Sequence, residues 1–352
     1  MNAYSSLAAV AVRTAGRADH DAIDAFVSQH SEAQLFHRPQ WIAAVERGCR
    51  QRAHYLVAEQ SGAIVGLLPL SEIRSPLFGA AMVSTGFGVG GGILSRSEAA
   101  TEALASAAWR LAESFACPSV ELRGGTLPEG WERREGVYAD FVRELPADDD
   151  SILKLIPRRQ RAEVRRGLAS GLEIRIGRSP ADLDTHYAVY AEALRNHGTP
   201  VFPKALFSAM LDGFGQDADI LSVWRDGRPL STLFSFYFKD TVLPFWGGGT
   251  PEARGARANE VAYFELMRHA ARRGCTRFDF GRSKVGTGPY AFKKHWGFEP
   301  RPLVYAVRST VAGAGREMNP LHPKYRLRVA LWRKLPLWAA NRLGPPIARG
   351  LG

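Results

Sequence analysis

The sequence predicts an α+β protein built from two similar domains, each a twisted mixed sheet flanked by helices, followed by a basic helical tail. The chain has 352 residues, and a single hydrophobic core stops growing at about 250–300 residues. Its apolar fraction of 45% is sufficient for two packed cores. The order helix, hairpin, strand, helix, strand also occurs twice, as a pattern rather than as residue identity. We therefore expect domains at residues 1–150 and 151–307, and the tail at 308–352.

The first half shows this order between residues 39 and 122. A helix is expected at 39–47, and two apolar strands meet at Ser61-Gly62, a dipeptide that favours a hairpin turn. The remaining expected elements are an extended run near 80–94, a long helix at 97–115 and a strand at 119–122.

The second half repeats the order. Asp226-Gly227 is a strong turn dipeptide and predicts a hairpin. Asn259 is expected to cap the N-terminus of a helix, and Gly274 to end it. The other expected elements are helices at 182–197, 203–211 and 260–273 and strands at 241–246 and 277–280.

An arginine-rich helix is expected between the halves, within residues 154–171. Arg158, Arg161 and Arg165 recur at a spacing that places three guanidinium groups on one helix face. Two interpretations remain open at this point. The face is either solvated, as charge runs usually are, or it binds an anion, because the arginine fork matches phosphate oxygens.

The stretch from residue 276 to 298 has the highest density of candidate functional side chains. Phe278 and Phe280 alternate with polar residues as in a strand, and the glycines that follow indicate a tight loop. Aromatic and basic side chains come next, at the end of the expected strand. Asp279 is expected to orient Arg282 or a substrate amine, or to form a structural ion pair.

Lys293 is the candidate for catalysis in this stretch. On a loop edge beside Phe292 and Tyr290, it would place a positive charge in a partly apolar setting, where charge interactions are stronger than in water. Lys294 is a rival for the same role. No Cys-His or Ser-His-Asp set is recognisable by spacing, so direct transfer without a covalent enzyme intermediate is the simpler mechanism.

The net charge of +11 is concentrated in the tail. The tail contains many Lys and Arg residues and one acidic residue, Glu317. The basic residues are interleaved with Leu327, Leu331, Leu335 and Trp338. Such a segment, here residues 322–352, is typical of a helix in the interface of the inner membrane. A tRNA-binding arm and a packing helix over the second domain remain alternatives, and Pro336 is expected to split the segment into two short helices.

Composition also bears on the compartment. No apolar run reaches the roughly 20 residues of a spanning helix, and the N-terminus lacks the pattern of a secretory signal. We expect a cytoplasmic protein, peripheral at most on the membrane. Cys49, Cys117 and Cys275 are isolated from other ligand residues, so neither a metal site nor a disulfide framework is expected. No DNA-reading motif is evident.

Four motifs together resemble the FemAB family, and more narrowly the FemAB-related proteins encoded with exosortase/PEP-CTERM exopolysaccharide systems. The motifs are FHRPQW at 36–41, the arginine-rich helix after Pro157, GGGTPEARGARANEVAYFELMRHA at 247–270 and FDFGRSKVGTGPYAFKKHWGF at 278–298. The likeness covers about residues 30–307. It implies two tandem GNAT-like domains that transfer an acyl or aminoacyl group to an amine on a saccharide or peptide precursor of the cell envelope.

The resemblance also implies roles for individual residues. The family's Phe-Lys pair falls on Phe292-Lys293, and that lysine is thought to stabilise charge developing during transfer. An arginine of the inter-domain helix contacts nucleotide phosphates, which implicates Arg158, Arg161 or Arg165. Asn259 and Trp41 within the motifs, and Trp246 directly before the third motif, join Tyr290, Arg282 and Asp279 as expected substrate contacts.

The donor implied is acyl-CoA or aminoacyl-tRNA, with no tightly bound cofactor. The alternative from another functional class is a duplicated GNAT-like scaffold without catalysis, which binds a nucleotide-linked or lipid-linked saccharide for a partner machine.

Overall fold

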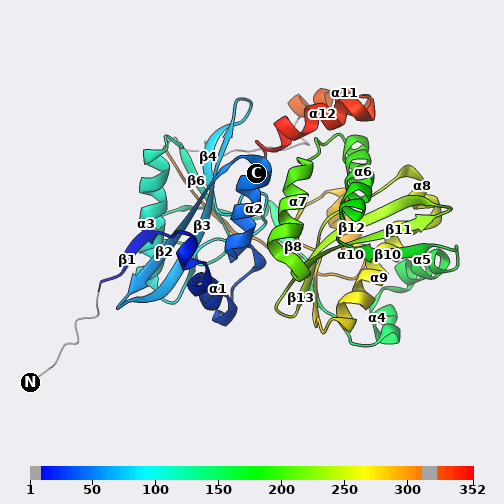
Figure 1. Ribbon diagram of the computed structural model, residues 1–352, viewed down its shortest axis with the longest axis horizontal. Helices are drawn as coiled ribbons and strands as arrows, with labels where there is room; N and C mark the ends of the chain where they lie inside the picture. Colours follow the sequence, from blue (N-terminus) through cyan, green and yellow to red (C-terminus); the bar gives the residue numbers. More distant parts are fainter. Residues whose placement is uncertain (1–8, 311–322) are drawn as a thin grey trace, which may run out of the picture. The chain divides into compact units, whose positions relative to one another are not determined.

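The computed structural model describes residues 9–310 and 323–352, which form two compact units (Figure 1). Among these residues, the first unit contains 9–135, 304–310 and 350–352, and the second contains 136–303 and 323–349. These units differ from the predicted ranges, because residues 136–150 hold strands that pair within the second unit and residues 305–309 hold a strand of the first. Part of the predicted tail, residues 311–322, lies outside the described residues.

The first unit is a sheet covered by helices. Its strands run in the order β1-β2-β3-β4-β6-β17-β7, and β5 pairs with β3. Helix α3 packs on this sheet with Leu104, Ala108 and Ala112 fully buried. The strands are β1 (Ala11–Thr14), β2 (Arg52–Gln60), β3 (Ala63–Ser75), β4 (Gly79–Val83), β5 (Leu94–Ser95), β6 (Ser119–Arg123), β7 (Glu132–Arg134) and β17 (Tyr305–Ser309). The helices are η1 (Arg17–Asp19), α1 (His20–Gln29), η2 (Leu35–His37), α2 (Pro39–Cys49) and α3 (Glu98–Ser114).

Local sequence determines most of these elements. The predicted hairpin forms between β2 and β3, where Ser61 (φ 53°) and Gly62 (φ 78°) both take the left-handed conformation. Ser97 caps α3 by accepting a hydrogen bond from the backbone N–H of Ala100. The extended run expected near 80–94 is wrong in its middle, because the glycine-rich residues 84–93 leave the sheet between β4 and β5.

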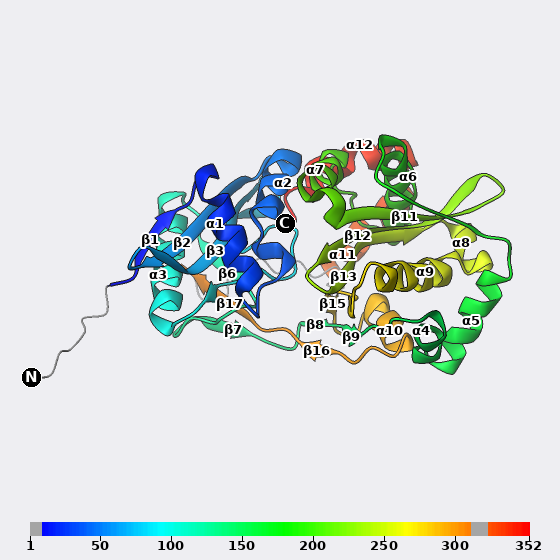
Figure 2. The ribbon, with the colours of Figure 1, turned by 60° about the horizontal axis from the view of Figure 1, so that its bottom comes forward.

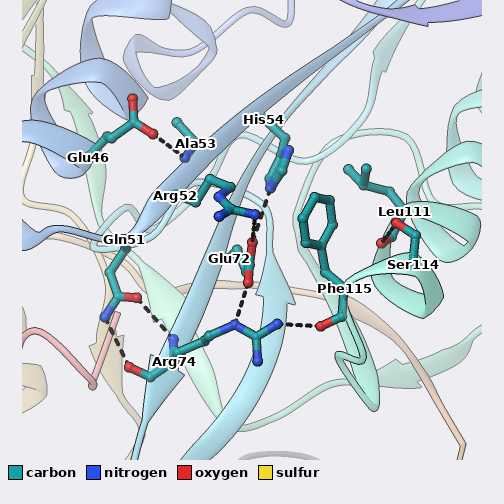
Figure 3. Close-up of polar contacts among 10 residues, drawn as sticks. All are labelled: Glu46, Gln51, Arg52, Ala53, His54, Glu72, Arg74, Leu111, Ser114 and Phe115. Atoms are coloured by element: carbon teal, nitrogen blue, oxygen red, sulfur yellow. Dashed lines mark hydrogen bonds and ion pairs between the residues drawn. The ribbon is translucent and has the colours of Figure 1, made fainter.

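A buried carboxylate ties β2 and β3 to the end of α3 (Figure 3). Glu72 on β3 is 4% exposed and pairs with Arg74, with Arg52 (3.6 Å) and with His54 (3.4 Å). Arg74 also donates to the carbonyl of Phe115. Because each charged group has a partner, the cluster is a stabilising contact between sheet and helix rather than an orphaned charge.

The second unit has the same order of elements around a six-stranded sheet, β10-β11-β12-β13-β14-β9. A small sheet, β15-β8-β16, accompanies it. The strands are β8 (Tyr138–Asp140), β9 (Val142–Glu144), β10 (Glu173–Gly177), β11 (Ala218–Arg225), β12 (Arg228–Phe238), β13 (Thr241–Gly249), β14 (Arg277–Asp279), β15 (Ser283–Lys284) and β16 (Arg301–Pro302).

Helices cover both faces of this sheet. Figure 2 shows α6 and α7 on one side of β11 and β12 and α9 on the other. The helices are α4 (Asp149–Leu155), α5 (Arg158–Leu168), α6 (Pro180–His197), α7 (Lys204–Phe214), η3 (Gly215–Asp217), α8 (Pro251–Ala256), α9 (Ala258–Arg272), α10 (Gly288–His295), α11 (Pro323–Arg333) and α12 (Leu337–Ala348).

Strands β13 and β14 are parallel and soon diverge. They pair only through Thr241 with Arg277 and Val242 with Phe278, although β13 continues to Gly249. The other edge of β13 stays paired with β12 along its whole length, with one register shift between Phe234 and Ser235. In the first unit, β4 and β6 are likewise parallel and pair over two residues. In the first unit, however, β4 ends at Val83, and the backbone of Gly92 and Ile93 pairs with Arg123 and Gly125 beyond that point. The opening of the sheet therefore belongs to the second unit.

Three predicted details of the second unit differ from the structure. Asn259 is not a helix cap, since α9 begins at Ala258 and Arg257, in the left-handed conformation (φ 58°), holds the cap position. Residues 288–295 form helix α10, so Lys293 lies on a helix rather than on a loop edge. Pro203 is the N-cap of α7 and not its first residue.

The tail helices α11 and α12 pack on α6 (Figure 1). The helices separate at Pro336, as predicted from the sequence. Gly198 approaches Val329 and Gly344 approaches Val201 so closely that neither position has room for a β-carbon without rearrangement. In the parts of the chain that the structure describes, no helix is long and apolar enough to cross a bilayer.

Stability of the second unit is expected to fall in mild acid because of His186. This ring is fully buried on α6, burial lowers its pKa to about 3, and Nε2 has no partner among the described residues. The unfolded chain takes up the proton near pH 6.5, so the stabilisation is complete above that pH and is lost as the pH falls towards 3. The unfolding free energy of the wild type should therefore fall between pH 7 and pH 5, and His186→Gln should make this fall smaller by up to about 2 kcal/mol.

Urea denaturation at the two pH values measures this effect. The exposed His295, changed to Gln, is the matched control and should leave the pH dependence as in the wild type. Equal pH dependence in the His186 variant and the wild type would show that this ring is not the acid-sensitive group.

Candidate functional site

A cavity of about 650 Å³ lies in the second unit where β13 has separated from β14. Its volume is in the range of small-molecule sites. Side chains and backbone from α6, β12, β13, α8, α9, α10 and α11 form its wall. The lining residues are Ala193, Asn196, His197, Leu233, Gly247, Gly248, Gly249, Thr250, Pro251, Arg254, Asn259, Tyr263, Phe292 and Arg333.

Three consecutive glycines at the end of β13 give this wall its shape. A β-carbon would lie 2.5 Å from Leu233 at Gly247, 2.7 Å from Ala193 at Gly248 and 2.4 Å from Asn259 at Gly249. Neighbouring elements therefore approach the backbone of β13 more closely than any side chain would permit. The cavity is consequently bounded on this side by peptide backbone.

The charged lining residues of the cavity are all basic. They are Arg254 from α8 and Arg333 from α11, joined by the titratable His197 from α6, and no carboxylate is among the lining residues. Arg333 donates to the backbone carbonyl of His197 (3.3 Å), which holds the last residue of α11 against the end of α6. A cavity lined in this way favours a ligand with negative charge.

Asn259 lies in the cavity wall, as expected for a substrate contact. Its side-chain oxygen accepts a hydrogen bond from Ser231 (2.7 Å). Ser231 also donates to the carbonyl of Gly248 (3.2 Å). The amide is thus held in a fixed orientation beside the glycine run.

Phe292 and Tyr263 form the aromatic part of the wall, with ring centroids 5.5 Å apart. Tyr263 also contacts Phe280 at the end of β14 (4.9 Å). Burial raises the pKa of Tyr263 to about 12, so this phenol remains protonated at neutral pH.

Lys293 lies beside the cavity wall but is not part of it. The side chain is 9% exposed, and Nζ donates to the carbonyls of Gly281 (2.7 Å) and Arg282 (3.1 Å). Burial lowers the pKa of Lys293 to about 8, against the opposing effect of two nearby carboxylates. Its neighbour Lys294 is exposed.

The two carboxylates are Asp279 at the end of β14 and Asp140 at the end of β8. Asp279 accepts a hydrogen bond from the backbone N–H of Gly281 (2.7 Å). Burial, followed by the charge of Asp140, raises the pKa of Asp279 well above its usual range. One oxygen of Asp140 is buried without a partner among the described residues. The structure therefore places Asp279 with Asp140 and Lys293, whereas the guanidinium of Arg282 lies over the ring of Tyr138 (4.4 Å).

The predicted arginines do not meet at this cavity. Arg161 turns its guanidinium to the end of α4, where it donates to the carbonyls of Lys154 (2.8 Å) and Ile156 (2.9 Å). Arg158 and Arg165 are exposed on α5, outside the cavity lining. The expected face of three guanidinium groups is therefore reduced to two, because one of them caps a neighbouring helix.

The remaining predicted contacts are packing residues. Trp41 has no exposed surface in the first unit, and its indole N–H donates to the carbonyl of Gly86 (3.1 Å). Trp246 is 4% exposed among aromatic rings, with Phe207 at 5.0 Å and Phe234 at 5.5 Å. Tyr290 packs on Phe141 (5.3 Å) and is outside the cavity lining.

The matching position in the first unit is filled by the protein itself. Arg123, at the end of β6, is 8% exposed and donates to the carbonyls of Thr85 (3.4 Å) and Gly88 (2.9 Å). The side chain therefore occupies the region where β4 and β6 separate. No group of three or more potential metal ligands is found in residues 9–310 and 323–352.

Three lining residues, His197, Arg254 and Arg333, were not among the residues predicted from the sequence. Arg254 lies within the motif at residues 247–270, but nothing in that motif marked this arginine as a site residue. His197 and Arg333 are 136 residues apart, and no periodicity or spacing links them. Only the packing of α11 on α6 brings them together.

Lys293 is expected to titrate with a midpoint near pH 8, and Asp140→Asn should lower that midpoint further. The variant removes a negative charge that favours the protonated amine, while the burial that disfavours it remains. The measurement is an NMR titration of the lysine side-chain resonances. Asp184→Asn, at an exposed aspartate that pairs with Lys204, is the matched control. A wild-type midpoint near the ordinary 10.5 would contradict the buried environment.

Comparisons with known proteins agree with this architecture. Residues 158–294 match the family model of the acetyltransferase (GNAT) domain, a range that includes most of the cavity wall. No curated protein matches the sequence. Among solved structures, FemX has a TM-score of 0.66 at 16% identity, covering 84% of this chain and 96% of that one.

Two further structures share the fold. The C-terminal domain of a putative lysylphosphatidylglycerol synthetase from Agrobacterium fabrum has a TM-score of 0.54 at 14% identity, over 82% of this chain and 91% of that one. A tandem GNAT protein from the clavulanic acid biosynthesis pathway, without AcCoA, has a TM-score of 0.53 at 13% identity, over 86% and 99%. The predicted fold of tandem GNAT-like domains is thereby confirmed, and the match of residues 158–294 to the GNAT acetyltransferase domain supports an acyltransferase.

Proposed function

We propose that the protein is an N-acyltransferase that passes an acyl or aminoacyl group to an amine on an exopolysaccharide or other cell-envelope precursor. The observation that carries this proposal is the basic cavity at the divergence of β13 and β14, within the range that matches the GNAT domain. A parallel pair that opens in this way offers a donor both free backbone groups and a hollow beside them.

The donor is proposed to be acyl-CoA or aminoacyl-tRNA, bound reversibly through its phosphates to Arg254 and Arg333. Both donors carry phosphate groups, at the nucleotide end of coenzyme A and along the tRNA backbone, and these suit a lining without carboxylates. The GNAT domain and the tandem GNAT relative favour the thioester donor. The likeness to FemX and to a lysylphosphatidylglycerol synthetase favours the aminoacyl donor.

Phe292 and Lys293 have different roles at the end of the cavity in this proposal. Phe292 contacts the donor directly, because its ring is part of the wall. Lys293 stabilises the negative charge that develops on the donor carbonyl, acting electrostatically from the buried position behind Phe292, where a charge interaction is weakly screened. Arg158 and Arg165, exposed on α5, are left to contact more distant phosphates of a long donor or acceptor.

The acceptor class follows from the sequence resemblance to FemAB-related proteins of PEP-CTERM systems. We propose a saccharide or peptide precursor that presents a free amine on the inner face of the cytoplasmic membrane. The catalytic unit would then work at the membrane surface.

The tail helices are suited to such a surface. Leu327, Leu331 and Trp338 are 69%, 57% and 72% exposed, and the exposed Lys334 and Arg342 lie among them. No acidic residue occurs between residues 323 and 349. We propose that α11 and α12 bind an anionic bilayer peripherally, through apolar insertion together with attraction between opposite charges.

Binding and transfer by the purified chain test the proposed activity. Calorimetry should show micromolar binding of acetyl-CoA or of alanyl-tRNA, and the double variant Arg254→Gln/Arg333→Gln should bind at least tenfold more weakly, because each lost charge-assisted hydrogen bond costs about 1.5–3 kcal/mol. Lys293→Met should retain binding and lose about 100-fold in the rate of transfer to glucosamine. The exposed Lys294, changed to Met, is the matched control.

Two outcomes would count against these assignments. If Lys294→Met lost activity and Lys293→Met kept it, the two lysines would exchange roles. If neither donor bound, the alternative of a non-catalytic scaffold for a nucleotide-linked or lipid-linked saccharide would replace the enzyme.

Membrane association is tested with vesicles. The chain should sediment with vesicles containing phosphatidylglycerol and much less with pure phosphatidylcholine. Leu331→Ser/Trp338→Ser should weaken binding by about tenfold or more, because burying one such side chain contributes about 1.5–3 kcal/mol. Leu168→Ser, at an exposed leucine of α5, is the control. Binding that is abolished entirely by moderate salt and is unaffected by the double substitution would instead indicate a tRNA-binding arm.

A further inference from the structure

We propose that His197 is the general base of the reaction and accepts the proton that the acceptor amine releases during transfer. This inference rests on the proposed acyltransferase function and adds to it a catalytic residue that comes from α6, outside the conspicuous motifs of the sequence. The histidine is the last residue of α6, which ends at Gly198 in the left-handed conformation (φ 80°).

The position of His197 fits this role. It lies in the same cavity wall as Phe292, against which the donor is proposed to bind. Within the described residues its ring nitrogens have no hydrogen-bond partner, whereas its backbone carbonyl is held by Arg333 (3.3 Å). The backbone is therefore fixed while the ring remains available to a ligand.

No other lining side chain can accept a proton at neutral pH. Arg254 and Arg333 are permanently protonated, and Tyr263 keeps its proton because burial raises its pKa to about 12. The cavity wall contains no carboxylate and no lysine. Lys293 and Asp279 lie outside the lining, and Lys293 already donates to two carbonyls.

The surroundings keep the imidazole neutral. His197 keeps exposed surface, but partial desolvation in the cavity wall, followed by the positive charge of Arg333 from α11, lowers its pKa below the ordinary value of 6.5. Arg254 from α8 adds a positive charge to the same wall. Arg195 on α6 adds a further positive charge nearby, because its guanidinium donates to the carbonyl of Arg333 (3.5 Å). The partial negative charge at the end of α6 acts in the opposite direction, but the net shift is downward.

The proposed step balances in atoms and charge. A ring nitrogen of His197 takes one proton from the acceptor ammonium, and the freed electron pair of the amine forms a C–N bond to the donor carbonyl carbon. The carbonyl π electrons move to oxygen, which becomes an oxyanion. Collapse of this intermediate breaks the C–S bond of a thioester or the C–O bond of an ester. The leaving thiolate or alkoxide takes up the second proton of the former ammonium, the imidazolium releases the first proton to solvent and returns to imidazole, and the amide keeps a single N–H.

The first experiment measures the ring itself. In the full chain labelled with ¹³C-histidine, NMR titration should give His197 a midpoint below pH 6.5, with the resonance assigned by its loss in His197→Gln. Arg333→Gln should raise that midpoint, and the same substitution should leave the midpoint of the exposed His295 unchanged. A His197 midpoint above 7 in the wild type would overturn the inference, because the ring would be protonated at neutral pH.

The second experiment measures chemistry with acetyl-CoA or alanyl-tRNA as donor and glucosamine as acceptor. His197→Gln should lower kcat by about 10²–10⁴-fold, the usual contribution of a general base, while donor binding measured by calorimetry stays within threefold. In this variant the pH profile of kcat/KM should lose the acidic limb that reports the titration of His197. In His197→Ala, added imidazole should restore part of the rate. His295→Gln, the matched control, should behave as the wild type.

The outcomes separate this inference from the function on which it rests. If the wild type transfers the acyl group and His197→Gln keeps the wild-type rate and pH profile, His197 is not the general base, while the proposed acyltransferase function is retained. If His197→Gln loses rate without a change of pH profile and imidazole gives no rescue, His197 only shapes the cavity, and the inference fails. If the wild type binds neither donor and transfers nothing, the proposed function and the base fail together.

Discussion

The site depends on one constraint, which is that the parallel strands β13 and β14 pair over only two residues before they diverge. A central strand normally uses both edges for hydrogen bonding, so a divergence leaves backbone groups on the inner edge of β13 without strand partners. Such groups are tolerated only where a ligand, water or another part of the chain reaches them. The three glycines at 247–249 make this edge a wall of peptide backbone, and α9 and α10 close the space from the other side. The opening thereby sets the position of the cavity, and the packing of α11 on α6 adds Arg333 and His197 to its wall.

Charge is separated across the end of the same sheet. Basic side chains line the cavity, whereas the carboxylates Asp140 and Asp279 lie behind it with Lys293. A ligand with negative charge would therefore meet basic side chains and no carboxylate at the cavity wall. Lys293 lies next to both regions, because Phe292, its neighbour on α10, is part of the cavity wall. In the first unit β4 ends where its pairing with β6 ends, and Arg123 donates to carbonyls of the loop that follows β4, so duplication of the fold has not produced two equivalent cavities.

Sequence patterns predicted the fold better than they predicted the site. The hairpin turns at Ser61-Gly62 and Asp226-Gly227 and the break at Pro336 are local features, and the structure contains each of them. The substrate contacts expected at Trp41 and Trp246 are interior packing residues. An aromatic residue in a recognisable motif can serve the core as well as a ligand, and the sequence does not distinguish these uses. Asn259 lies in the cavity wall, and its predicted role as a helix cap is wrong, because α9 already begins at Ala258.

The sequence by itself determined the order of helices and strands, their duplication and the concentration of positive charge in the tail, because these depend on propensity, turn chemistry and composition along a short stretch of chain. Tertiary structure alone decided which side chains share the cavity. Arg161 turned to cap α4, while α11 packed on α6 and carried Arg333 to the carbonyl of His197. Those contacts join segments up to 136 residues apart, and their geometry is set by the packing of whole helices, which no local pattern encodes.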